Sequence, residues 1–126
     1  MSNQILFCSS VAILIIQIFS ILYFGTPFLF STIALLAAFT SILNHGFTST
    51  LLKMIDRTYI PIYIVCNTVI IFFEIQDALL LCSIYAIMLT GIVAVIYAIA
   101  VGNVLLHLFS HFVLITVHLI MCYNFK

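Results

Sequence analysis

The feature that most constrains this chain is the near absence of charge over two long stretches. Residues 1–52 and 78–125 contain no Asp, Glu, Lys or Arg. A soluble domain usually carries about 25% charged residues because its surface faces water, whereas this chain of 126 residues has 5%. An uncharged, apolar run of about 18 residues or more is typical of a helix that spans a membrane. The sequence therefore predicts an all-α, polytopic integral membrane helical bundle.

Residues that break helices divide the two runs into shorter segments. Thr26 and Pro27 form a favourable helix start after Gly25, and Gly102 with Asn103 interrupts the last uncharged run. That run is long enough for two spans, since about 20 residues at about 1.5 Å each cross about 30 Å of hydrocarbon. We predict a single transmembrane domain with about five transmembrane helices, four being the alternative. The domain covers 1–126, and the expected helices are 5–24, 27–55, 58–73, 78–101 and 104–124.

The few charges limit the classes of partner. The formal net charge is zero and there is no basic run, so the chain lacks the electrostatic footprint of a nucleic-acid-binding protein. The predicted spans leave almost no residues for a soluble domain, so the expected partners are the lipid bilayer and other subunits of a membrane complex. With five spans, Lys53 and Arg57 share a side with the N-terminus, and the positive-inside rule favours the cytoplasm or mitochondrial matrix for that side.

The histidines are the polar residues that most need an explanation, because an ionisable side chain inside a membrane is costly. On the last predicted helix, His107, His111 and His118 fall within about 40° of one another. A second polar stripe recurs every four positions on the predicted helix 27–55 and consists of Ser41, His45, Ser49 and Lys53. We place His45 about 15 Å from the end of its helix and His111 about 11 Å into the last helix. Contact between these helices then brings two imidazoles together.

Four interpretations fit this pattern. Two histidines on separate helices can hold a haem iron from opposite sides, and three histidines with a carboxylate can hold zinc with one position open for water. A histidine–carboxylate chain can relay protons. Alternatively, the imidazoles hydrogen-bond polar groups on neighbouring helices and only stabilise the bundle.

The segment Ser41-Ile-Leu-Asn-His45, followed by Asp56 and Tyr59, resembles the small membrane-anchor subunit of succinate dehydrogenase, the cytochrome b small subunit. The resemblance covers about 20 residues. It implies that His45 is an axial ligand of haem b, that Asp56 lies near the ubiquinone site, and that Tyr59 reaches the quinone from the turn between the second and third helices. His111 is then the candidate for a further contribution to haem or quinone chemistry.

A second pattern is Ser41 with His45, then Asp56, then His107 with His111. It is similar to that of the zinc-dependent membrane hydrolase superfamily that includes alkaline ceramidases and progestin/adipoQ receptors. This resemblance implies that His45, His107 and His111 bind zinc. Asp56 and Ser41 then support the ligands or hold the catalytic water.

Our first prediction is a membrane subunit of a respiratory-chain complex, in the mitochondrial inner membrane or its bacterial counterpart. Such a subunit takes part in haem b and ubiquinone electron transfer or is a structural accessory, and no catalytic residue is assigned to it. The alternative prediction is a compact zinc-dependent lipid amide hydrolase. A small channel or proton-relay protein is a third class.

Overall fold

The computed structural model describes residues 2–125 as an all-helical chain, and no strand occurs among them. Each of its five helices is long and apolar enough to cross a membrane, which confirms the predicted helical class and helix number. The helices are α1 (Ser2–Phe24), α2 (Phe28–Gly46), α3 (Thr50–Glu74), α4 (Ala78–Val101) and α5 (Val104–Asn124).

Local sequence explains the bounds of α4 and α5, which agree with the predicted ranges. The Asp77 side chain caps α4 by accepting a hydrogen bond from the Leu80 N–H at 2.7 Å. The Asn103 side chain caps α5 in the same way, from the Leu106 N–H at 3.0 Å. Gly102 ends α4 in the left-handed conformation, with φ of 67°, which glycine adopts without steric cost.

The predicted bounds 27–55 and 58–73 are wrong. The second helix ends at Gly46 and the third begins at Thr50, with extended backbone at Phe47 and Ser49. The sequence predicts this break beside the charged residues, because charged side chains avoid hydrocarbon. The structure instead places Lys53 and Arg57 on the first turns of α3 with exposed side chains, so the helix accommodates them without a break.

This shift changes several predicted positions. His45 lies one residue from the end of α2 rather than deep within it, and Pro61 lies inside α3 rather than near its start. Ser49 and Lys53 do not continue the stripe of Ser41 and His45, because they belong to the next turn and the next helix.

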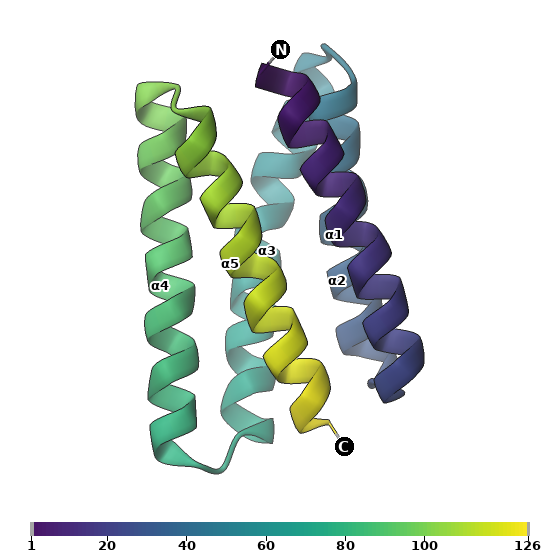
Figure 1. The fold of residues 1–126 in the computed structure, drawn as a ribbon, viewed down its shortest axis with the longest axis vertical. Helices are drawn as coiled ribbons and strands as arrows, with labels where there is room; N and C mark the ends of the chain where they lie inside the picture. The colour runs from purple at the N-terminus through teal and green to yellow at the C-terminus, as the bar shows by residue number, and fades with distance from the viewer. Residues whose placement is uncertain (1, 126) are drawn as a thin grey trace.

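The helices α1, α2 and α5 pack together, and α3 and α4 each pack on one of them (Figure 1). The helix α1 contacts both α2 and α5, α3 packs on α2, and α4 packs on α5, whereas α3 and α4 approach each other less closely and are joined by a hydrogen bond from the Tyr85 hydroxyl to the Thr68 carbonyl. The predicted contact between the second and fifth helices is confirmed, because the Phe30 ring of α2 stacks on His118 of α5 and the His45 ring lies 5.2 Å from that of His107. The N-terminal end of α1, the α2–α3 turn and the α4–α5 turn lie at one end of the bundle. The largest buried cluster includes Phe30, Ile71, Ile84 and Met121.

Candidate metal centre

Three of the four histidines converge at one place. His45 ends α2, while His107 and His111 lie on the first turns of α5, four residues apart and therefore on one helix face. Each imidazole offers one nitrogen, and the three nitrogens lie within 4.8 Å of one another. The ring centroids are 5.1 to 5.7 Å apart. We call His45, His107 and His111 the histidine triad.

The donor atoms of the triad match what a metal ion requires. His111 is buried, His45 and His107 are half-buried, and the Nε2 atom of His45 is buried without a hydrogen-bond partner among residues 2–125. Buried polar atoms nearly always have a partner, so this unpartnered nitrogen is unusual. Neutral imidazole nitrogens are preferred ligands of zinc, with three protein ligands and one open position in catalytic sites. The residues present therefore fit a zinc-like ion.

Ser9 of α1 favours one tautomer of His111. The Ser9 hydroxyl donates to the Leu6 carbonyl at 2.8 Å and lies 2.7 Å from the Nδ1 atom of His111. With its proton on the Leu6 carbonyl, the Ser9 hydroxyl is available to accept from an N–H at Nδ1, which is the tautomer of His111 with an unprotonated Nε2. Such an outer hydrogen bond is the usual way in which proteins orient a metal-binding histidine.

Asp56 faces the triad from α3. Its side chain is 4% exposed, Oδ2 accepts a hydrogen bond from the Asn44 amide at 2.6 Å, and Oδ1 is buried without a partner among the described residues. The carboxylate is not among the groups that lie within 4.8 Å of one another. Asp56 and His107 do, however, line both cavities beside the triad.

Ser41 and Tyr59 differ in their relation to the triad. The Ser41 hydroxyl lies 2.9 Å from that of Ser10 and lines a cavity shared with His107 and His111. Tyr59 belongs to α3, not to a turn, and its hydroxyl points to the Ile33 carbonyl at 3.5 Å. Tyr59 lines neither of the cavities beside the triad, so the position predicted for it from the turn is wrong.

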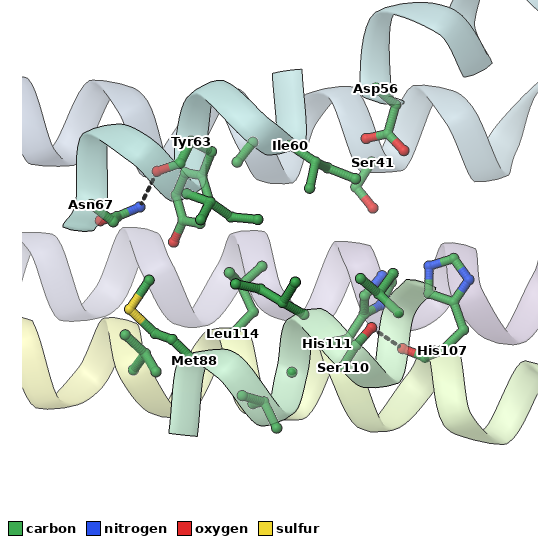
Figure 2. A pocket seen from close by; sticks show the side chains of 17 residues that line it. Ser41, Asp56, Ile60, Tyr63, Asn67, Met88, His107, Ser110, His111 and Leu114 are labelled. Atoms are coloured by element: carbon green, nitrogen blue, oxygen red, sulfur yellow. Dashed lines mark hydrogen bonds between the residues drawn. The ribbon is translucent and has the colours of Figure 1, made fainter. Parts of the chain in front are cut away.

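Two cavities of different character meet at the triad. The apolar cavity has a volume of about 110 Å³ and reaches from Asp56, Ser41, His107 and His111 toward Tyr63 and Asn67 (Figure 2). Its remaining walls are mainly aliphatic and include Ile60, Ile64, Met88, Ile92, Val113 and Leu114. The polar cavity, of about 230 Å³, lies toward the helix ends and is lined in part by Asn44, His45, Lys53, Asp56, Arg57 and Asn103.

His118 lies apart from the triad. Its Nε2 atom lies 2.9 Å from the Ser20 hydroxyl and 3.3 Å from the Cys122 sulfur, and its ring stacks on Phe30. The histidines of the predicted stripe on α5 therefore belong to two separate clusters, because His118 is about two turns further along the helix than His111. The packing and hydrogen bonds of His118 suit a structural role.

Sequence analysis missed three residues of the site: Ser9, Ser10 and Asn44. Ser9 and Ser10 form an adjacent polar pair within an apolar helix, which marks a buried contact but not its partner. No spacing rule joins Asn44 to Asp56, because the intervening turn sets their distance. The partners of these residues can therefore be identified only from the folded structure.

No protein-family model matches the chain, and neither the curated proteins nor the solved structures give a match.

Proposed function

We propose that this chain is an integral membrane protein that binds zinc through the histidine triad and hydrolyses an amide bond of a membrane lipid. The observation that carries the proposal is the convergence of three imidazoles where an apolar cavity meets a polar one, both cavities being lined by a carboxylate, Asp56, with one oxygen free of hydrogen bonds among the described residues.

The surface supports placement in a membrane. Large apolar side chains are exposed along every helix, for example Phe28 at 86% and Leu79 at 80%. Soluble monomers rarely expose continuous apolar surface beyond a few hundred Å². A bilayer of about 30 Å of hydrocarbon accommodates helices of this length and composition.

The triad suits a compact ion better than a flat macrocycle. Three nitrogens within 4.8 Å of one another suit three of the four ligand positions of a tetrahedral metal site. Axial ligation of haem needs two imidazoles on opposite faces of the ring. Haem b, ubiquinone and membership of a respiratory complex stay predictions, for which the site supplies no separate support.

The chemistry divides between the ion and the protein. A zinc ion held by His45, His107 and His111 would supply Lewis acidity for the activation of water and the polarisation of the scissile carbonyl. Asp56 takes a proton from the attacking water as its oxygen bonds to the acyl carbon. The carbon–nitrogen bond then breaks, Asp56 returns the proton to the leaving nitrogen, and a fatty acid and an amine are released. Such proton transfer typically contributes about 10²- to 10⁴-fold to the rate.

Replacing Asp56 tests this assignment. We expect Asp56→Asn to lower fatty-acid release from N-palmitoyl amides in mixed micelles by about 10²- to 10⁴-fold, with the zinc content unchanged. Asp77→Asn is the matched control, because Asp77 caps α4 at the other end of the bundle and Asn caps equally well. Equal activity of the two variants contradicts the role of Asp56.

The same preparation separates the alternatives. A reducible b-type absorption band that His45→Ala abolishes would favour the respiratory-chain prediction over the hydrolase. A colourless protein that holds zinc and releases fatty acid supports the hydrolase.

A further inference from the structure

We propose that the substrate is an anionic lipid amide, whose acyl chain occupies the apolar cavity and whose acidic polar part faces Lys53 and Arg57 in the polar cavity. This inference rests on the proposed hydrolase and names its substrate class.

The two cavities define two ends of a ligand. They share Asp56, Ile60, Val95 and His107 as lining residues, so they are adjacent at the place where the chemistry is proposed. One side of the scissile bond therefore faces aliphatic walls, and the other faces polar side chains. A lipid amide has this division, because its acyl chain and its polar part lie on opposite sides of the bond that is cut.

The lining of the apolar cavity runs along the helices, which is the direction of the acyl chains in a leaflet. Its lining on α5 runs from His107 to Val117, which is about 15 Å along the helix. This is about half of the hydrocarbon thickness of a bilayer. The helices α3 and α4 both line this cavity and make few close backbone approaches to each other; a cross-helix hydrogen bond, from the Tyr85 hydroxyl to the Thr68 carbonyl at 2.9 Å, lies in the halves of the two helices nearer the turn that joins them. We infer that the acyl chain enters from the bilayer between these two helices.

The polar cavity carries an excess of positive charge. Lys53 and Arg57 lie four residues apart on α3, both exposed and both lining this cavity. Asp56 is the carboxylate at this end, and it is buried and hydrogen-bonded to Asn44. Glu74 and Asp77 end α3 and cap α4, at the opposite end of the bundle (Figure 1). A zinc ion on the triad increases the positive charge further.

This charge distribution favours an acidic polar part over a neutral one. A carboxylate beyond the scissile amide faces two cations, Lys53 and Arg57, against the single carboxylate of Asp56 that lines the same cavity, and arginine and lysine both bind carboxylates through charge-assisted hydrogen bonds. The polar cavity lies at the helix ends, where a lipid's polar part lies in a membrane. The position of the polar cavity and its charge therefore both favour an acidic polar part of the substrate.

A matched pair of substrates tests the inference. N-palmitoylglycine and N-palmitoylethanolamine share the acyl chain and the amide, and differ in whether the released part bears a carboxylate. For the zinc-loaded wild-type protein in neutral-detergent micelles, we expect kcat/KM to be about 10-fold higher for N-palmitoylglycine, about 5-fold at most from each exposed cation.

Charge variants separate recognition from folding. Lys53→Gln with Arg57→Gln should abolish this preference by lowering kcat/KM for N-palmitoylglycine, mainly through a higher KM, by more than it lowers kcat/KM for the neutral amide. Glu74→Gln also alters one charge but at the far end, and it should preserve the preference. Lys53→Glu with Arg57→Glu should reverse it.

Each other outcome has a distinct meaning. Equal kcat/KM for both substrates in the wild type, or an equal loss for both in the double Gln variant, overturns the anionic substrate and leaves the hydrolase standing. Failure of the zinc-loaded protein to cleave either substrate overturns the inference as well. A protein that binds no zinc contradicts the proposed function itself.

Discussion

Ser9 lies on a different helix from every histidine of the triad, yet its hydroxyl lies 2.7 Å from Nδ1 of His111 in a partly buried contact. With the hydroxyl proton on the Leu6 carbonyl, this contact favours the tautomer of His111 that leaves Nε2 available as a metal ligand.

Removing this hydroxyl should weaken metal binding without unfolding the protein. We expect Ser9→Ala to lower zinc affinity by about 10- to 100-fold, the usual effect of losing such a supporting contact. Competition with a chelator measures the change. Ser83→Ala is the control, because the Ser83 hydroxyl bonds only the Leu79 carbonyl on an exposed face of α4. Equal zinc affinity of the two variants contradicts the assignment to Ser9.

The residue identities of the triad were predictable from the sequence, but their depth was not. An ionisable group in an apolar helix is marked by its cost, and the four-residue spacing of His107 and His111 places both on one face. The contribution of His45 depends on where α2 ends. Close to that end the helix packs tightly on α1, since a Cβ atom at Gly46 would lie 3.0 Å from the Phe7 ring.

At the scale of helices, glycine also sets the closest approach of α4 to α5. A Cβ atom at Gly91 would lie 2.7 Å from Cγ1 of Val113, and both residues line the apolar cavity. The pair therefore fixes the spacing of two walls of the proposed chain-binding site.

Substitution at this crossing should be costly but repairable. We expect Gly91→Ala to lower the free energy of unfolding by about 1 to 3 kcal/mol through overpacking. Adding Val113→Ala should recover most of the loss, because it removes the atoms that the new methyl group meets. Thermal unfolding in detergent measures both variants. A double variant less stable than Gly91→Ala alone would show that another contact limits the spacing.

The break between α2 and α3 shows where element prediction from sequence failed. Capping residues at Asp77 and Asn103 act locally, and the helices that they begin were predicted with the correct bounds. The α2–α3 turn lacks a side-chain cap at Ser49, and the nearby charges suggested a later break. Packing against α1 and the Asn44–Asp56 hydrogen bond involve other parts of the chain, so no local rule could locate the turn.

On the scale of the whole molecule, the exposed apolar surface has to be covered by lipid or detergent. We expect the protein to stay in the membrane pellet after an alkaline carbonate wash, because each of the five helices meets the length and hydropathy of a span. Immunoblotting of pellet and supernatant measures the distribution. Release into the supernatant would contradict integral insertion.

The most direct test of the account is the metal content of the purified protein. Elemental analysis of the detergent-solubilised wild type should give about one zinc per chain, as a site of three histidines with one open position requires. His45→Ala and His111→Ala should each lose the metal, whereas His118→Gln should retain it because His118 lies outside the triad. A folded wild type that takes up no zinc from a zinc-containing buffer, or variants of the triad that bind as much zinc as His118→Gln, would contradict the central claim.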